Sequence, residues 1–150
     1  MCGATPLGEC PMRNIGAKLR FHTTGSGLTE ITEEVRAWLH SQSVSSGVLT
    51  LFCRHTSASL LVQENAARAV RADLERFFAA LAPEDPRRYE HDDEGPDDMP
   101  AHLRSALTGV NLSIPVSDGR MVLGTWQGIY LFEHRRRAHE REVAAHFIGD

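Results

Sequence analysis

The segment Gly47–Cys53 is apolar at nearly every position, which restricts the possible fold of this chain more than any other feature. A strand with one wet face alternates apolar and polar residues, whereas a strand covered on both faces does not. The segment therefore predicts a strand covered on both faces. Residues 54–60, directly after it, carry an imidazole and three hydroxyl groups. Side chains at the end of a buried strand are firmly placed and still reachable, so this junction predicts a functional site.

Further strands are expected from apolar periodicity. Their positions are residues 15–23, 110–116, 120–123, 129–132 and 143–148. Ser117-Asp118-Gly119 has the composition of a hairpin turn and joins the second and third of these strands. With helices placed between the strands and hairpins late in the chain, the pattern predicts an α+β fold.

Three helices are expected beside these strands. The first follows Thr29 as its cap, the second runs from Glu64 to Pro83, and the third has Pro100 in its first turn and Gly109 as its stop. The apolar faces of the first two consist of Ile31, Val35, Trp38 and Leu39, and of Val70, Leu74, Phe77, Phe78 and Leu81. The second helix would make residues 54–60 a strand-to-helix junction.

Composition agrees with one domain. Of 150 residues, 41% are hydrophobic, enough for a core without disulfides or structural zinc. A formal net charge of −4 argues against nucleic-acid binding. The three cysteines have no Cys-x-x-Cys spacing, which argues against a disulfide framework. Residues 1–13 are expected to be a flexible leader and residues 14–150 the domain. No stretch resembles a signal peptide or membrane span, and the expected location is the cytoplasm.

Three histidines from separate segments are candidate ligands for one metal ion. His55 follows the apolar strand, His91 lies in an acidic loop, and His102 lies on the short third helix. Neutral imidazole is the commonest ligand of zinc and suits other transition metals. The spacing does not show that the three converge. Each also has a simpler interpretation: a hydrogen bond to its own loop, solvation, or coverage of a helix face.

The acidic loop, residues 84–98, offers carboxylates, which are the ligands that magnesium prefers. A solvated loop is the simpler interpretation for Asp92 and Asp93. Asp98 stands close to Pro100 and His102, and we expect it to contact a ligand or to cap the short helix.

Near the end of the chain, residues 133–137 together with Arg141 form the only local basic cluster, from which Arg135, Arg137 and Arg141 are the candidates. The planar guanidinium group matches phosphate, so at least one of them is expected to contact a phosphorylated substrate. A solvated turn between the last two strands is the alternative. A third possibility is that Glu133 pairs with one of these arginines across a subunit boundary.

Two further polar residues are candidates for the site. Glu64 would act as a general acid or base if it faced the same cavity as His55, or it would stabilise the first turn of its helix. The amide of Gln127 would orient a ligand. Its neighbour Trp126 is expected to pack in the core or at a subunit interface.

Four ordered blocks of the chain resemble the YjbQ-like family, also called the secondary thiamine-phosphate synthase family. They are His55-Thr56-Ser57-Ala58-Ser59-Leu60 with Glu64-Asn65, Pro100-Ala101-His102-Leu103, Ser113-Ile114-Pro115-Val116 with Asp118-Gly119, and Leu123-Gly124-Thr125-Trp126-Gln127. The resemblance covers all but the first dozen or so residues. It implies a single domain with a mixed, mostly antiparallel sheet or sandwich, flanking helices and assembly as a homotrimer. It also favours His55 and His102 as site residues, because both lie inside its blocks.

The resemblance implies an enzyme that joins an aminopyrimidine pyrophosphate to a thiazole phosphate. A divalent ion (zinc, manganese or magnesium) would be held by His55, His91 and His102, with His55 and Glu64 as catalytic groups. Contacts to the small phosphorylated substrate are expected from Ser57, Ser59, Asn65, Asp98, Gln127, Arg135, Arg137 and Arg141. The alternatives are a metal-assisted hydrolase and a non-catalytic trimer that binds a metal or a small molecule.

Overall fold

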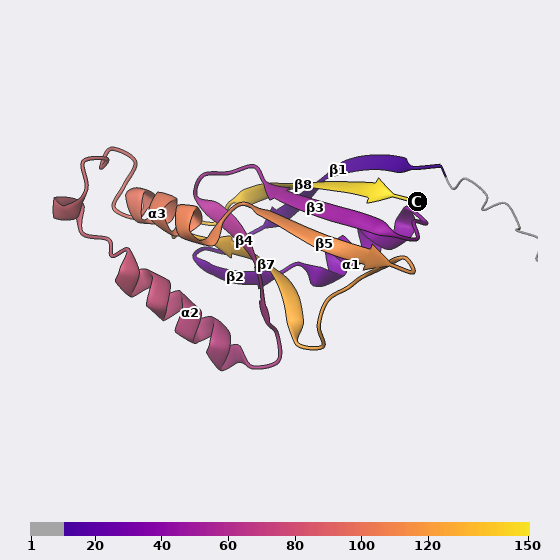
Figure 1. Cartoon of the computed structure of the whole chain (residues 1–150). Coiled ribbons are helices and arrows are strands. Elements are labelled where there is room, and N and C mark those ends of the chain that lie inside the picture. Colours follow the sequence, from indigo (N-terminus) through magenta and orange to yellow (C-terminus); the bar gives the residue numbers. More distant parts are fainter. Residues whose placement is uncertain (1–10) are drawn as a thin grey trace, which may run out of the picture.

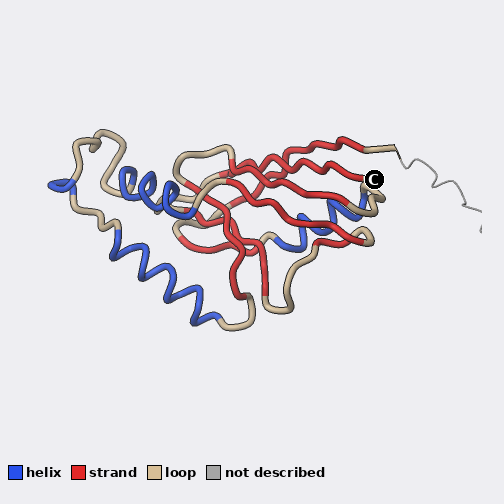
Figure 2. Tube along the Cα trace, in the orientation of Figure 1, coloured by secondary structure: helices blue, strands red, loops and turns tan. Residues whose placement is uncertain are grey.

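The computed structural model describes residues 11–150 as two packed antiparallel sheets with three α-helices (Figures 1 and 2). The larger sheet has the strand order β1-β8-β3-β5-β6, and the smaller sheet has the order β2-β7-β4. The elements are β1 (Arg13–His22), β2 (Gly27–Glu30), α1 (Thr32–Ser41), β3 (Gly47–Cys53), β4 (Ala58–Glu64), α2 (Arg68–Leu81), the 3₁₀ turn η1 (Pro86–Arg88), α3 (Asp98–Thr108), β5 (Asn111–Ser117), β6 (Arg120–Met121), β7 (Gln127–Glu133) and β8 (Glu140–Gly149). The α+β prediction is confirmed.

The hydrophobic core lies between the two sheets and extends to α1. Alternate residues of the central strands point into it, as the two-residue period of a strand requires. These core residues are Leu49 and Leu51 of β3, Leu60 of β4, Ile129 and Leu131 of β7, and Val143, Ala145 and Phe147 of β8. Ile31, just before α1, and Val35 and Leu39 on α1 complete the core. Trp38 packs against it and is partly buried, so the predicted face of this helix is confirmed.

The prediction that β3 is covered on both faces is wrong within this chain. Val48 and Phe52 are 46% and 47% exposed, although Leu49 and Leu51 are fully buried. The helices pack against β2, β4, β6 and β7, so none of them covers the outer face of β3. The apolar run therefore has one face in the core and one apolar face at the surface.

The segment after residue 57 is a strand and not the start of a helix. Ala58–Glu64 pairs with β7 along its whole length, and α2 begins only at Arg68. A short apolar run does not distinguish a strand from a helix by its period, and here pairing with β7 decides the outcome. Residues 54–57 thus connect a strand of the larger sheet to a strand of the smaller one.

The predicted apolar face of α2 is only partly covered. No residue of α2 is buried, and Phe77 and Leu81 are 59% and 50% exposed. Only Phe78 makes a close aromatic contact with the sheet, edge-to-face with Phe132 at 5.6 Å between ring centroids. The helix contacts the sheet mainly along β2, and α2 and α3 lie at the end of the molecule opposite the C-terminus (Figure 1).

The helix ends agree with prediction at α3 but not at α1. Pro100 lies in the first turn of α3, and Gly109 ends that helix with φ of +90°, a conformation that favours glycine. Thr29 does not cap α1 because it lies within β2. The α1 helix has no side-chain cap, although the Thr32 hydroxyl donates to Glu30 and accepts from the Ile129 amide.

The predicted leader, residues 1–13, falls mostly outside the described residues. Its last residue, Arg13, begins β1, so the domain starts at least one residue earlier than predicted. Within residues 11–150, no helix combines the length and the apolar character that crossing a membrane requires.

Candidate functional site

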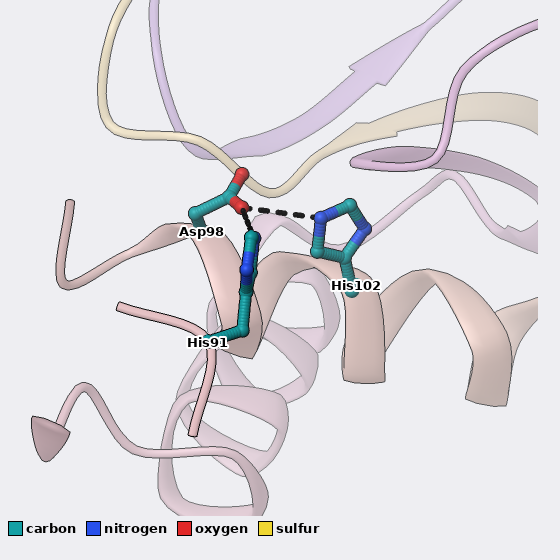
Figure 3. A group of neighbouring side chains, drawn as sticks. All are labelled: His91, Asp98 and His102. Carbon is teal, nitrogen blue, oxygen red and sulfur yellow. Dashed lines mark hydrogen bonds and ion pairs between the residues drawn. The ribbon is translucent and has the colours of Figure 1, made fainter. Parts of the chain in front are cut away.

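The side chains of His91, Asp98 and His102, here called the metal group, point toward one another (Figure 3). Asp98 and His102 lie one turn apart on α3, and His91 comes from the loop before that helix. The Nε2 atoms of His91 and His102 are 2.8 and 3.1 Å from the same carboxylate oxygen, Oδ2 of Asp98. All three ligand atoms lie within 4.8 Å of one another, a spacing that suits one ion.

The opposite nitrogen of each imidazole faces an oxygen acceptor. Nδ1 of His102 is 3.0 Å from the Thr56 carbonyl oxygen, and Nδ1 of His91 is 3.2 Å from a carboxylate oxygen of Asp93. A carbonyl only accepts, so Nδ1 of His102 must carry a hydrogen. In the neutral form of His102, the Nε2 lone pair therefore points at Asp98. The hydrogen bond to Asp98, together with nearby carboxylates, raises the pKa of His91.

Arg135 fixes the other side of Asp98. Its guanidinium pairs with Oδ1 of Asp98 and, at 3.1 Å, with Asp97, and its Nη2 donates to the Glu94 carbonyl at 2.9 Å. The Asp98 side chain is only 3% exposed. This pairing leaves Oδ2 as the carboxylate oxygen that faces the histidines, and it ties the acidic loop to α3.

The structure does not bring His55 into the metal group, so the predicted set His55–His91–His102 is replaced by His91–Asp98–His102. Nε2 of His55 accepts a hydrogen bond from the Glu142 backbone amide at 2.8 Å. The nitrogen that would bind an ion is therefore occupied, and the hydrogen of the neutral ring lies on Nδ1. Burial, followed by the nearby Arg141 charge, lowers the pKa of His55, which favours this neutral form.

His55 lines two neighbouring cavities instead. One, of about 650 Å³, is lined by residues 52–57, Val110 and Arg141. The other, of about 350 Å³, is lined by His55, Thr56, His102, Ser105, Ala106, Gly109 and Val110. His55, Thr56 and Val110 belong to both, so residues 54–57 (the 54–57 loop) stand between the metal group and the larger cavity.

Glu64, Asn65 and Gln127 lie far from His55. Six residue steps of β4 separate Ala58 from Glu64, about 20 Å at the rise of a strand. Glu64 accepts from the Ala67 amide, Gln127 accepts from the Gly124 amide, and Asn65 is 3.4 Å from Glu30. Within this chain, the geometry does not support a shared cavity for Glu64 and His55.

Arg141 is not free to bind phosphate. Its guanidinium pairs with Glu133 at 2.5 and 2.7 Å and donates to the Ser57 hydroxyl at 3.0 Å. Both charged side chains are buried, and the Thr23 hydroxyl also donates to Glu133 at 2.8 Å. The alternative of a Glu133 pair across a subunit boundary is wrong, because the pair forms within the chain.

The remaining residues that were predicted to contact a substrate or an interface differ in exposure. Ser59 is fully buried, within 2.8 Å of Nε2 of His134, and it accepts from Thr108 at 2.6 Å, so it belongs to the interior. Arg137 is exposed, and the described residues include no carboxylate that pairs with it. Trp126 is 63% exposed, which makes the core prediction wrong and leaves a subunit interface as a prediction.

Sequence reasoning missed two features of the site. Asp98 was expected to contact a substrate or cap a helix, although the four-residue spacing of Asp98 and His102 on one helix face is a usable signal for a shared ion. The role of the Thr56 carbonyl left no signal in the sequence, because a backbone oxygen is the same for every residue.

Comparison with known proteins places the chain in a family. Residues 17–150 match the family described as "UPF0047 protein YjbQ-like". The chain is 52% identical over 128 residues to the UPF0047 protein sll1880 of Synechocystis sp., which covers 85% of this chain and 87% of that protein. It is 45% identical over 133 residues to the UPF0047 protein YjbQ of Escherichia coli O157:H7, covering 88% and 96% of the two chains.

Solved structures agree with this match. The conserved hypothetical protein TT1486 from Thermus thermophilus has a TM-score of 0.76 at 38% identity, covering 85% of this chain and 97% of that one. A YbjQ-like protein from Sulfolobus solfataricus has a TM-score of 0.85 at 23% identity, covering 93% and 100%, and it supports the fold alone. The family match and these relatives together show that the chain belongs to the UPF0047 YjbQ-like family.

Proposed function

We propose that the protein binds a divalent transition-metal ion at His91, Asp98 and His102 and uses it on a small phosphorylated substrate. The observation that carries this proposal is the direction of the two imidazoles. Each Nδ1 faces an oxygen, and each Nε2 faces Oδ2 of Asp98. Two imidazole nitrogens and one carboxylate oxygen that converge in this way form a donor set that suits one divalent cation. Ligand histidines of metal sites usually have the same outer hydrogen bond on the other nitrogen.

The donor set favours some ions over others. Two imidazoles and one carboxylate suit zinc or manganese, whereas magnesium prefers oxygen ligands. Three protein ligands are typical of a catalytic zinc site, which keeps a position for substrate. A bound ion would supply a Lewis acid that stabilises negative charge on phosphoryl oxygens.

The residues around the group have definite tasks in this proposal. Arg135 holds Asp98 in place, and the Thr56 carbonyl fixes the ring of His102. The neutral ring of His55 presents an N–H donor beside the two cavities. The reaction with an aminopyrimidine pyrophosphate and a thiazole phosphate is supported by the family resemblance. The homotrimer and the cytoplasmic location stay predictions.

Metal content tests the site directly. We expect about one zinc or manganese ion per chain in protein purified without an affinity tag, and none in a folded His91→Ala/His102→Ala variant. His22→Ala is the matched control, since that side chain is 81% exposed and distant in sequence from the group. Equal metal in the double variant would contradict the ligand assignment.

Activity tests the reaction. The metal-loaded protein should release pyrophosphate from the aminopyrimidine pyrophosphate when thiazole phosphate is present, and the double variant should not. Metal binding without turnover of this pair would favour the non-catalytic metal-binding alternative. Release of phosphate without thiazole phosphate would favour the hydrolase.

A further inference from the structure

We infer that the 54–57 loop is an anion subsite, which receives a phosphoryl group of the ligand through His55, Thr56 and Ser57. This inference deepens the proposed function and rests on it in one respect: the same substrate would also reach the metal group. The predicted phosphate contacts were arginines, but Arg135 and Arg141 are paired with carboxylates inside the chain. The free hydrogen-bond donors lie on the loop beside them.

The loop carries several donors that lack an internal acceptor. His55 has its hydrogen on Nδ1, because Nε2 accepts from the Glu142 amide. The backbone amides of Thr56 and Ser57 have no acceptor among residues 11–150. The Ser57 hydroxyl oxygen accepts from Arg141, which leaves its hydrogen to donate elsewhere. Donors of this kind on adjacent residues form the usual environment of a bound phosphate.

A buried network holds the loop in this conformation. Arg141 donates to the Ser57 hydroxyl and, at 3.3 Å, to the Ser57 carbonyl. The opposite side of Arg141 is fixed by Glu133, which the Arg135 amide and the Thr23 hydroxyl also contact. Burial alone would raise the pKa of Glu133, but these hydrogen bonds lower it overall and keep the pair charged. Donors held in advance lose less entropy when a ligand binds.

The cavities indicate the class of ligand. The larger one has Phe52 and Val110 as apolar lining beside the loop donors, and its volume is about 650 Å³. The smaller one continues past His55 and Thr56 to His102. The ligand is therefore a phosphate ester or diphosphate with an apolar group along Phe52. In a diphosphate, one phosphoryl group would occupy the loop while the second reaches toward the metal group.

The loop is also bonded to the metal group. The Thr56 carbonyl accepts from Nδ1 of His102, so the residue that offers an amide to the anion also orients a metal ligand. An anion bound to the loop and a metal ion bound to His102 would therefore be connected through the backbone of Thr56.

The test is a calorimetric titration of metal-free protein with inorganic pyrophosphate. We expect binding by the wild type, and equal binding by His91→Ala in the absence of metal. The loop variant His55→Phe/Ser57→Ala should bind at least about tenfold more weakly, because it removes the Nδ1–H and hydroxyl donors to a charged group. Arg137→Gln is the control for a general basic surface and should bind as the wild type does. Equal binding by the loop variant, or loss only in Arg137→Gln, would overturn the inference.

A second measurement does not depend on a variant that folds well. In ¹H–¹⁵N spectra of the wild type, pyrophosphate should shift the amide signals of Thr56 and Ser57 more than those of other residues. Unshifted signals at both positions would also overturn the inference. Metal content separates the two proposals, because the loop variant should keep its ion. If this variant binds pyrophosphate as the wild type does, the anion subsite is contradicted and the metal site is not. If the wild type holds no metal but binds pyrophosphate, the metal site is contradicted and the anion subsite is not.

Discussion

The two ends of β4 carry similar polar residues and differ in whether those residues keep free hydrogen-bonding groups. At the far end, Glu64 and Gln127 accept from nearby backbone amides. At the near end, Nδ1–H of His55 and the amide of Thr56 have no acceptor within residues 11–150. Polar residues at a strand end thus either bond to the nearby backbone or keep free donors, and only the second kind is available to a ligand.

The largest effect on stability is expected from removing the charge of Arg141, which holds the loop at the near end of β4. Arg141→Met would leave Glu133 buried without its partner, which costs about 3–5 kcal/mol of unfolding free energy. Urea unfolding measures this loss. Arg137→Met, four residues earlier and exposed, should change stability by less than about 0.5 kcal/mol. Equal effects of the two changes would show that the buried pair does not hold the loop.

Acid should lower the unfolding free energy through His134, which contacts Ser59 at the near end of β4. This side chain is 1% exposed, and burial, with a smaller effect of Arg104, lowers its pKa to about 3. Folded His134 stays neutral while the unfolded chain takes up a proton below about pH 6.5, so stability falls as the pH falls.

Comparison with His134→Gln isolates this contribution. Between about pH 6.5 and about pH 4.5, the wild type should lose about 2 kcal/mol more unfolding free energy than the variant, as measured in urea. Parallel pH profiles would place the acid sensitivity elsewhere, for example at the carboxylates.

A smaller effect, on metal affinity, is expected from removing Arg135, which contacts Asp98 of the metal group. Arg135→Gln removes the charge that holds Asp98 and should weaken zinc binding by about 10- to 100-fold. Competition with a chelating dye measures the affinity, and Arg137→Gln is the control on the same turn. Unchanged zinc affinity would mean that Asp98 needs no support from Arg135.

The smallest effect is expected at the far end. Glu64→Gln keeps an oxygen that accepts from the Ala67 amide, so stability should change by less than about 0.5 kcal/mol. Zinc and pyrophosphate affinities should match those of the wild type. A large loss of turnover in Glu64→Gln would break the comparison and restore Glu64 as a catalytic group.

Local signals in the sequence predicted much of the fold. The hairpin at Asp118-Gly119 was correct, because both residues adopt the positive φ values that such turns need, 51° and 69°. The end of α3 at Gly109 was correct for a similar reason. The strand at residues 58–64 was missed, and the helix after it was predicted to begin too early, because pairing with β7, some seventy residues later, decides the conformation of this segment. The exposed faces of β3 and α2 could likewise not be predicted from the sequence, since exposure depends on which elements pack nearby.

In the candidate site, too, local features were predicted and long-range contacts were not. His91 and His102 were predicted from residue type, and the structure brings them together with Asp98. The position of His55 could not be predicted, because its ring is fixed by the Glu142 amide, 87 residues away in sequence. The pairing of Arg141 with Glu133 also depends on how β7 and β8 lie against the interior.

Two members of the metal group lie on one turn of α3, and the third, His91, comes from the loop between η1 and that helix. A bound ion would therefore tie this loop to the helix, because it would join His91 to Asp98 and His102. The same ion would protect the loop from proteases. Cleavage between residues 89 and 96 would then report, in a simple time course, how often the site stands open.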